Sequence, residues 1–248
     1  PENLCGKFKL FNHMKENLLI TGGTGFIGKR LSILAIKEGF DVTVLSLNKP
    51  SRADKIIGVK YLQADIANFS SLKKTLKSYS FTFVVNLAGY INHSYFLNEG
   101  SQIFNVHFNG VINLLRILKW KSLKRFVQIG SSDEYGNNKA PQVESMQEFP
   151  ISPYSLGKHC VTNLLQMLNR NENFPSVILR LFLVYGPEQN DNRFFPQIIK
   201  GCLLNSKFPT SEGKQIRDFC YIDDITRGIL MSLKNNDAIG EIINLGSG

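Results

Sequence analysis

Apolar residues recur along this chain in two alternating patterns. Short, near-continuous runs rich in Val, Ile, Leu and Phe are typical of strands buried in a parallel sheet. Longer stretches between them repeat apolar positions every three or four residues, which predicts amphipathic helices. The runs predict strands at residues 17–21, 41–46, 59–64, 81–88, 124–130 and 176–182, and the longer stretches predict helices at 26–39, 70–79, 103–120 and from about 153 onward.

This alternation predicts an α/β fold, a Rossmann-type doubly wound parallel sheet with right-handed crossovers and helices on both faces. After residue 186 the pattern becomes loop-like and polar. A helix near 195–204, a short strand within 215–222, a helix from Asp223 and a strand at 241–246 follow. These elements predict a smaller, discontinuous α/β substrate lobe.

The predicted domain boundaries follow from the same pattern. We expect a Rossmann domain at residues 14–186. Residues 187–248 are expected to form mostly the substrate lobe, with a helix and a strand returning to the sheet. Residues 1–13 precede Met14 and are expected to be an N-terminal extension. The loop-like ending "NLGSG" suggests that a C-terminal piece is missing.

Composition narrows the class of protein. With 43% hydrophobic and 20% charged residues, the 248-residue chain is typical of a globular protein. No apolar run approaches the roughly 18 residues of a membrane span, and the first residues lack a secretory pattern. The cysteines match neither a zinc site nor a CxxC pair, so we expect reduced thiols, no metal and a cytoplasmic protein; they are Cys5, Cys160, Cys202 and Cys220.

The net charge of +9 raises the question of a nucleic-acid partner. The lysines and arginines are scattered over predicted helix faces and turns. Scattered charge is usual for a solvated surface, and a basic cleft for a small anionic substrate also fits. We therefore expect no nucleic-acid partner.

A glycine-rich stretch, "TGGTGFIGKRL", directly follows the first predicted strand. Gly22, Gly25 and Gly28 are spaced as G-x-x-G-x-x-G before a predicted helix. Glycines permit a tight turn, close approach of a pyrophosphate and close packing of helix on sheet, and the helix start offers N–H groups to phosphates. The stretch predicts dinucleotide binding, with contacts that include Thr24, Phe26 and Ile27.

The end of the second strand bears on which dinucleotide is bound. An acid at this position would bind the ribose hydroxyl of NAD, but here Ser46 is followed by Lys49 and Arg52. A hydroxyl and two cations favour NADP(H), and NAD(H) remains possible. Asp65, with Ile66 beside it, is a candidate for the adenine edge, although Asp65 could instead cap the following helix.

Tyr154 and Lys158 lie four residues apart at the start of an apolar helical run, which places them on one helix face. A cation and an oxidised nicotinamide beside the phenol would favour its phenolate. Tyr154 is therefore a candidate proton acceptor for a sugar hydroxyl, or a proton donor when a ketone is reduced. A third group should hydrogen-bond the reacting oxygen, and Ser131 or Ser132 follows the fifth strand, where α/β sheets bind ligands.

With these motifs in order, the chain resembles the extended short-chain dehydrogenase/reductases, in particular the NAD(P)-dependent epimerase/dehydratase group that acts on nucleotide sugars. The resemblance runs from about residue 16 to the end and rests on "TGGTGFIG", "NLAG", "SSDEYG", "YSLGK", "RLFLVYGP" and "RDFCYIDD".

The resemblance implies roles for individual residues. Ser131 would be the catalytic serine, Tyr154 the acid/base and Lys158 its partner, which also holds the nicotinamide ribose. Arg217 would meet the nucleotide diphosphate. Further implied contacts are Leu87, Ala88 and Gly89 for the cofactor, and Ser94, Asn92, Ser132, Asp133 and Arg193 for the substrate.

Two departures from the family pattern affect the reaction. Dehydratases of the group carry "TDE" or "TSE" at the catalytic hydroxyl, but Ser131 is followed by Ser132 and Asp133, so one carboxylate is missing and Asp133 is shorter than the usual Glu. Leu183 stands where many members have a substrate-binding Asn. Dehydration is weakened but not excluded.

A third unusual segment, "NLAGYINHSYF", looks most like sugar-nucleotide 4-ketoreductases, which also carry strands similar to "VQIGSSDEYG". We therefore expect reduction of a 4-keto-6-deoxy nucleotide sugar by NADPH, with an epimerase or 4,6-dehydratase of the same family as the alternative. A non-catalytic dinucleotide sensor is disfavoured because Ser131, Tyr154 and Lys158 are all present. His93 is expected to be a cleft-wall residue, and the resemblance also implies a homodimer.

Overall fold

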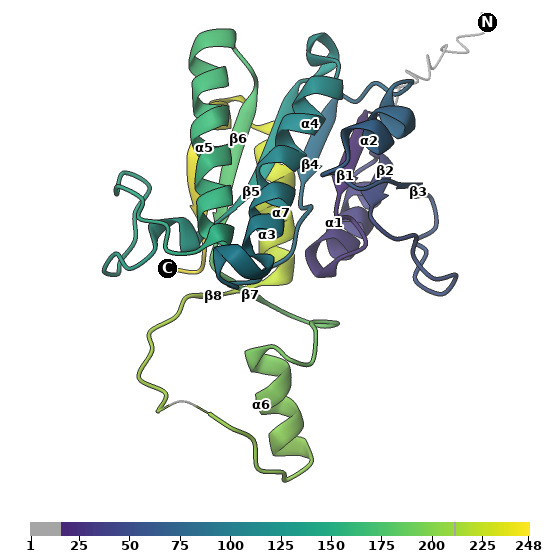
Figure 1. The fold of residues 1–248 in the computed structure, drawn as a ribbon. Helices are drawn as coiled ribbons and strands as arrows, with labels where there is room; N and C mark the ends of the chain where they lie inside the picture. Colours follow the sequence, from purple (N-terminus) through teal and green to yellow (C-terminus); the bar gives the residue numbers. More distant parts are fainter. Residues whose placement is uncertain (1–15, 211) are drawn as a thin grey trace, which may run out of the picture.

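A seven-stranded parallel sheet forms the centre of the molecule (Figure 1). The computed structural model describes residues 16–210 and 212–248, so the expected extension at 1–13 lies outside the described residues. The strand order is β3-β2-β1-β4-β5-β6-β9, and every neighbouring pair is parallel. The strands are β1 (Asn17–Thr21), β2 (Asp41–Ser46), β3 (Lys60–Gln63), β4 (Phe83–Asn86), β5 (Arg125–Ser131), β6 (Ser176–Leu181) and β9 (Ile242–Leu245).

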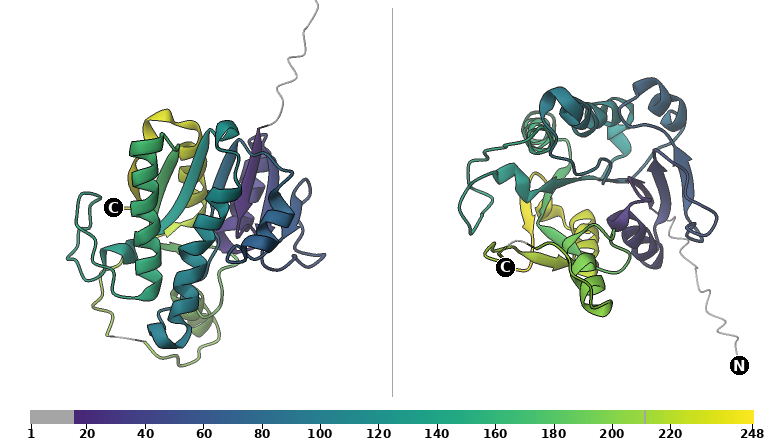
Figure 2. Two further views of the ribbon diagram at one scale, coloured as in Figure 1. Left: turned by 45° about the horizontal axis from the view of Figure 1, so that its top comes forward. Right: turned by 60° about the horizontal axis from the view of Figure 1, so that its bottom comes forward.

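Helices cover both faces of this sheet (Figure 2). Successive strand residues point to opposite faces, so Leu18 and Ile20 enter one apolar core while Leu19 enters the other. The first core is closed by α1 (Phe26–Lys37) and α7 (Ile222–Lys234). The opposite face carries α2 (Phe69–Leu76), α3 (Ser101–His107), α4 (Asn109–Ile117) and α5 (Pro153–Glu172). The expected α/β doubly wound fold is confirmed.

The order of the strands reverses beside β1, because β2 lies on one side of it and β4 on the other. The loops that leave β1 and β4 at the carboxyl edge of the sheet therefore lead to helices on opposite faces. Ligands of open α/β sheets bind at such a switch point. Gly22, Leu87 and Ser131 lie at this edge, at the ends of β1, β4 and β5.

One predicted helix differs from the structure. The helix expected at 103–120 is divided at Phe108 into α3 and α4, and Trp120 lies in a separate 3-10 turn at Trp120–Ser122. At this division His107 turns inward, with its ring nitrogen 3.0 Å from the carbonyl oxygen of Tyr90. The short strand expected within 215–222 is present as β8 (Phe219–Tyr221).

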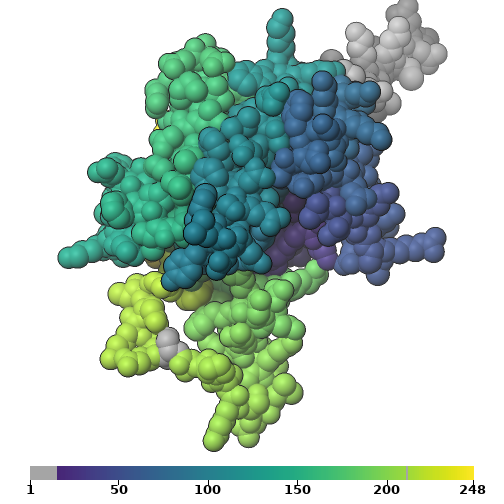
Figure 3. Space-filling model, viewed as in Figure 1, coloured from purple at the N-terminus to yellow at the C-terminus, as the bar shows by residue number. Residues whose placement is uncertain are grey.

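A small lobe extends from the carboxyl edge of the sheet (Figure 3). It begins after β7 (Leu183–Tyr185), contains α6 (Phe194–Leu203) and ends at β8, which pairs in parallel with β7. The chain then returns through α7 to β9, which pairs with β6. Within the described residues no helix has the length and apolar character that crossing a membrane requires.

The described cysteines are free thiols in different surroundings. Cys220 is buried, Cys160 is half-buried and Cys202 is exposed.

Candidate active site

In the glycine turn at residues 22–28, the positions of Gly22, Gly23 and Gly28 are packed too closely for a side chain. A Cβ on Gly22, whose φ is +70°, would lie 2.7 Å from the carbonyl oxygen of Leu87, and one on Gly28 would lie 2.5 Å from the Cα of Gly23. Gly23 itself packs against Val44, since its Cβ would lie 2.6 Å from a methyl carbon of that residue. Helix α1 is thereby pressed onto the ends of β1 and β2. The spacing G-x-x-G-x-x-G omitted Gly23, whose role depends on the side chain of the neighbouring strand.

The start of α1 fits an anionic ligand such as the dinucleotide pyrophosphate. Its N-cap, Gly25, makes no side-chain cap hydrogen bond, and the first turn contains no acidic residue. By contrast, Asn68 caps α2 and Ser152 caps α5 through their side chains. The positive end of the α1 dipole is therefore not compensated by a neighbouring carboxylate on the helix. Thr24, Phe26 and Ile27 lie in this turn, as the proposed contacts require.

The residues proposed to select the dinucleotide lie after β2. Ser46 is buried, and its hydroxyl donates to the carbonyl of Asn48 at 2.8 Å. Lys49 and Arg52 are exposed in the following loop. The nearby Asp54 is paired with Lys29 of α1 at 2.7 Å, so its negative charge is offset. The loop after β2 thus presents two exposed cations, and selection of NADP by them remains a proposal.

Asp65 does not cap α2. Its Oδ1 accepts the N–H of Ala67 at 2.8 Å, while the cap is Asn68, which accepts from Ser71. The neighbouring Ile66 is buried, and its carbonyl accepts from Asn113 of α4 at 3.0 Å. The turn is therefore held from both sides, with Asp65 half-buried, and its contact with the adenine edge remains a proposal.

Gly89, in the turn after β4, is required by a buried histidine. Its φ is +119°, and a Cβ there would lie 2.2 Å from the ring of His107. Leu87 donates its N–H to the carbonyl of Thr21, and the N–H of Ala88 donates to Asn86 Oδ1. The turn Leu87–Gly89 is thus anchored to β1 and to the end of β4 beside the glycine turn.

Tyr154 and Lys158 lie on the first turns of α5. The helix begins with Ser152 as its cap and Pro153 in the first turn, and both features favour a helix start at this residue. Lys158 is buried, and its Nζ donates to the carbonyl of Ile129 on β5 at 2.7 Å. The ammonium lies 5.9 Å from the centroid of the Tyr154 ring. The predicted pairing on one helix face is confirmed by this geometry, whereas its catalytic role remains a proposal.

Ser131 ends β5 and begins a short 3-10 turn with a reciprocal cap. Its Oγ accepts the N–H of Asp133 at 3.2 Å, and its own N–H donates to Glu134 Oε1 at 2.9 Å. The Oγ thus accepts a backbone hydrogen bond, and the same hydroxyl also hydrogen-bonds the phenol of Tyr154.

Burial controls the protonation of the two central groups. It raises the pKa of Tyr154 well above its ordinary value, and the charges of Asp133 and Glu134 act in the same direction, whereas a hydrogen bond with Ser131 opposes the shift. Burial lowers the pKa of Lys158 to about 8, against the attraction of Glu134. Tyr154 is therefore a protonated phenol at neutral pH, and Lys158 loses its proton more readily than an ordinary lysine.

His107 and His93 both contact the Tyr154 ring, at centroid distances of 4.9 and 5.6 Å. His107 is buried, whereas His93 is exposed and lies 3.6 Å from Asp133 Oδ2. His93 therefore forms part of the wall beside Tyr154, as expected. Sequence analysis missed His107 because it lies within an apolar helical pattern, where a histidine is usual in a core; its position three residues before Gly110 carried no recognised signal.

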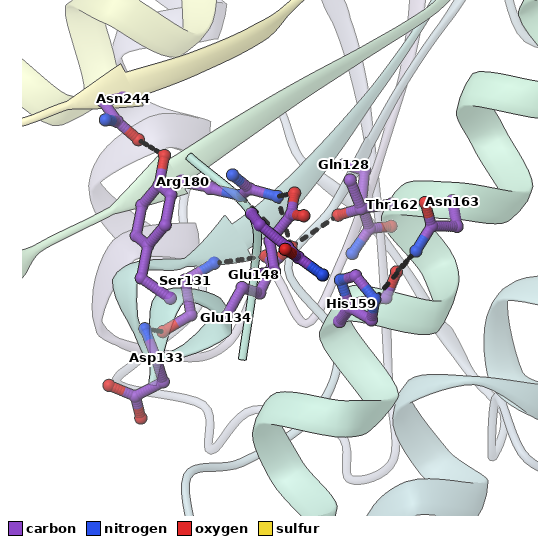
Figure 4. Close-up of polar contacts among 12 residues, drawn as sticks. Gln128, Ser131, Asp133, Glu134, Glu148, His159, Thr162, Asn163, Arg180 and Asn244 are labelled. Carbon is purple, nitrogen blue, oxygen red and sulfur yellow. Dashed lines mark hydrogen bonds and ion pairs between the residues drawn. The ribbon is translucent and has the colours of Figure 1, made fainter. Parts of the chain in front are cut away.

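A buried polar network beneath Ser131 was also missed (Figure 4). Glu134 contacts Arg180 at 3.1 Å and accepts the hydroxyl hydrogen of Thr162 at 2.7 Å. Arg180 also pairs with Glu148 from the loop that precedes α5. In the sequence these residues are far apart, and their pairing depends on the packing of β6 and α5 against β5.

The proposed substrate residues lie in two groups. Ser132 and Asp133 are partly exposed next to Ser131 and Tyr154, and Ser94 donates its hydroxyl to Asn92 at 2.7 Å in the loop near them. The lobe contributes the second group, since Arg193 precedes α6 and Arg217 precedes β8, both exposed. Arg193 is close enough for its charge to lower the pKa of Tyr154, against the dominant effect of burial.

Leu183, on β7, is partly exposed at 44%.

Within the described residues no cluster of three or more His, Cys, Asp or Glu side chains is arranged to hold a metal ion.

A glycine turn at the switch point of a doubly wound sheet, with a buried tyrosine and lysine beside it, defines a Rossmann-fold enzyme of the short-chain dehydrogenase/reductase type. The sequence model of the NAD dependent epimerase/dehydratase family matches residues 18–246. The chain belongs to this family and is an enzyme of the nucleotide-sugar epimerase and dehydratase type.

Curated relatives have two related activities. The chain is 32% identical to UDP-glucuronate 4-epimerase of Thermodesulfobacterium geofontis over 93% of its own length and 75% of that protein. It is 27% identical to dTDP-D-glucose 4,6-dehydratase of Dictyostelium discoideum over 94% of its own length. The chain spans 58% of that dehydratase.

Solved structures agree in fold. UDP-glucose 4-epimerase of Thermotoga maritima, with UDP-glucose, superposes with a TM-score of 0.84 at 24% identity, over 93% of this chain and 77% of that one. UDP-glucuronic acid 4-epimerase of Bacillus cereus, in complex with UDP-glucuronic acid and NAD, gives 0.79 at 28% identity, over 94% and 78%.

Proposed function

We propose that this enzyme reduces the keto group of a 4-keto-6-deoxy nucleotide sugar, with NADPH as the hydride donor and Tyr154 as the proton donor. The observation that carries the proposal is the placement of Tyr154 and Lys158 on the first turns of α5, with the Lys158 ammonium 5.9 Å from the Tyr154 ring centroid and Ser131 within hydrogen-bond reach of the phenol. A phenol in this setting suits an acid that protonates a developing alkoxide. NADPH, when bound, supplies the hydride to the carbonyl carbon.

The residues around Tyr154 support this direction. The Ser131 hydroxyl, which lies within hydrogen-bond reach of Tyr154, would donate to the carbonyl oxygen and hold the keto group next to the phenol. Tyr154 then gives its proton to that oxygen and regains one from solvent, so the protein is unchanged overall. Lys158 stabilises the phenolate formed between these two events.

Dehydration is less well supported, because it needs additional acid and base groups. Ser132 occupies one of the two expected acid positions. Glu134 is fully buried and bonded to Arg180, Thr162 and the Ser131 N–H. Asp133 is left as the acidic candidate in this turn, and it lies beside His93.

Epimerisation at the same carbon is the second candidate, since the relatives include UDP-glucuronate 4-epimerase. It uses the same serine, tyrosine and lysine, with the hydride removed from and returned to one carbon.

A spectrophotometric assay, together with product analysis, separates the reductase from the epimerase reaction. The protein is incubated with dTDP-4-keto-6-deoxyglucose and NADPH or NADH, and loss of reduced-nicotinamide absorbance is followed. Stoichiometric oxidation of NADPH supports the reductase. No oxidation, together with formation of a new epimer from UDP-glucuronate or UDP-glucose without net cofactor change, supports the epimerase instead.

A further inference from the structure

Glu134 is a fully buried carboxylate in the turn that follows Ser131. Its Oε1 accepts the N–H of Ser131 at 2.9 Å, and its Oε2 accepts the hydroxyl hydrogen of Thr162 at 2.7 Å. Arg180 donates to the same Oε2 from Nε at 3.2 Å. One side chain therefore joins the end of β5, the helix α5 and the strand β6.

Gly130 on β5 makes room for this carboxylate. A Cβ at Gly130 would lie 2.6 Å from Glu134 Oε1 and 3.1 Å from the Cγ of Arg180. Gly130 stands between Ile129, whose carbonyl binds Lys158, and Ser131. The strand β5 thus has no side chain at Gly130, where the Glu134 carboxylate bonds to the N–H of Ser131.

Thr162 lies one helical turn beyond Lys158 on α5, so its bond to Glu134 fixes the helix that carries Tyr154 and Lys158. The bond to the Ser131 N–H fixes the strand end that carries the serine. The carboxylate is shared between the two elements whose separation sets the distance from the serine hydroxyl to the phenol.

A buried ion pair is a costly way to stabilise a fold, because apolar residues of similar volume often serve at least as well. Arg180 is fully buried between Glu134 and Glu148, and its guanidinium lies 4.6 Å from the Tyr135 ring centroid. The hydrogen bonds of Glu134 and Arg180 do, however, fix the orientation of the groups that they join, which apolar packing cannot do.

We infer that Glu134 is a positioning residue that holds Ser131 in register with Tyr154 and Lys158, acting through its bonds to Ser131, Thr162 and Arg180. The inference rests on the proposed function of the same site. Glu134 acts through Ser131 and α5 and touches neither substrate nor cofactor in this role.

The charge environment of Lys158 supplies a readout that does not depend on the substrate. The charged or titratable groups coupled to it are Glu134 from the 3-10 turn, His107 from α3 and Tyr154 on its own helix. Glu134 raises the pKa of Lys158, against the larger effect of burial. A variant that removes the negative charge of Glu134 but keeps the packing should lower the pKa of Lys158 further. A variant that lets water reach Lys158 should raise that pKa.

The test is Glu134→Gln, with Glu144→Gln as the matched control. Glu144 is an exposed carboxylate that accepts the N–H of Asn244 and does not bond to Ser131 or Arg180. For each protein one measures kcat and KM in the NADPH assay, NADPH affinity by nicotinamide fluorescence, and the Lys158 midpoint by NMR of lysine labelled at Cε.

In Glu134→Gln we expect kcat to fall roughly tenfold to a hundredfold, as for a small misplacement of reacting groups. KM and NADPH affinity should stay near wild type, and the Lys158 midpoint should move below about 8. Glu144→Gln should match the wild type. Thr162→Val, which removes one bond and keeps the charge, should lower kcat by a smaller factor and leave the Lys158 midpoint in place.

An unchanged kcat in Glu134→Gln, or a Lys158 midpoint that rises towards 10.5, would overturn the inference and leave Glu134 as a residue that only supports packing. If Glu134→Gln does not fold, Thr162→Val decides, since an unchanged kcat there counts against positioning. A wild type that turns over no 4-keto sugar overturns the proposed reductase. The kcat comparison then moves to the epimerase assay, and the Lys158 midpoint still tests Glu134.

Discussion

The ring of His107 lies edge-on against the phenol ring of Tyr154, with 4.9 Å between the centroids and 86° between the planes. His107 is held there from two sides, by the carbonyl of Tyr90 and by the close approach of Gly89. A buried neutral imidazole thus supports the proposed proton donor, and the acid–base behaviour of this histidine has measurable consequences.

We expect His107 to make the protein sensitive to acid. Burial, together with the charge of Lys158, lowers its pKa from 6.5 to about 3. Between pH 6.5 and about 3, His107 is therefore protonated in the unfolded chain but not in the folded protein. The free energy of unfolding falls as the pH drops through this range. At 1.36 kcal/mol per pKa unit the full loss is about 5 kcal/mol.

Urea unfolding at pH 7, 5.5 and 4 measures this dependence. His107→Asn should flatten it, whereas His159→Asn, on α5 and partly exposed, should not. Identical pH dependence in the wild type and His107→Asn would show that other groups cause the acid sensitivity.

Tyr154→Phe removes the phenolic oxygen and keeps the ring between His93 and His107. We expect kcat to fall by about 10² to 10⁴, the usual contribution of a positioned general acid, while NADPH affinity stays near wild type. Steady-state kinetics and a fluorescence titration with NADPH measure the two effects. A variant that retains most of its kcat would assign the proton transfer to another group.

Lys49→Ala and Arg52→Ala should each raise the KM for NADPH about tenfold or more, because a charge-assisted hydrogen bond to a phosphate contributes roughly 1.5–3 kcal/mol. The KM for NADH should change little. Lys55→Ala, an exposed lysine in the same loop, is the control. Equal KM changes for NADPH and NADH would mean that Lys49 and Arg52 do not bind the phosphate that distinguishes NADPH from NADH.

Gly28→Ala should weaken or abolish dinucleotide binding, because the new methyl group would lie 2.5 Å from the Cα of Gly23. Gly25→Ala should be milder, since its nearest neighbour would be the carbonyl oxygen of Gly22 at 3.3 Å. Calorimetric titration with NADPH and thermal melts compare the two. Equal affinity in both variants would contradict the proposed close packing of α1 on the turn.

Arg217→Ala should raise the KM for the nucleotide sugar and leave kcat within a few-fold of wild type, because the proposed diphosphate contact lies away from the reacting carbon. The loss of one charge-assisted contact predicts a change of about tenfold or more. Arg227→Ala, an exposed arginine on α7, serves as the control. A fall in kcat with unchanged KM would instead place Arg217 near the chemistry.

Local sequence patterns were sufficient to predict the strands of the main sheet and the pairing of Tyr154 with Lys158. A buried parallel strand is a short apolar run, and a helix face is fixed by spacing alone, so both are visible without a partner. The division of the helix at Phe108 was missed, because the apolar pattern continues across it. What turns His107 inward is a carbonyl and a glycine from a different loop.

The buried network around Glu134 shows the same limit. In the sequence, Glu134 looks like a member of a polar turn, and Arg180 like an interruption of an apolar strand. Their roles depend on β5, β6 and α5 meeting in space, and on Gly130 leaving room for a carboxylate. Interactions between distant segments were therefore the part that sequence patterns could not supply.

The short parallel pair of β7 and β8 has a consequence for how far the lobe can vary. Residues 187–218 are inserted between these two strands, and the N–H of Leu183 bonds to the carbonyl of Asp218 at the base. Outside this insertion the chain returns to the main sheet through α7 and β9. Because both ends of the insertion meet at one strand pair, its length and sequence can change without displacing the strands of the main sheet.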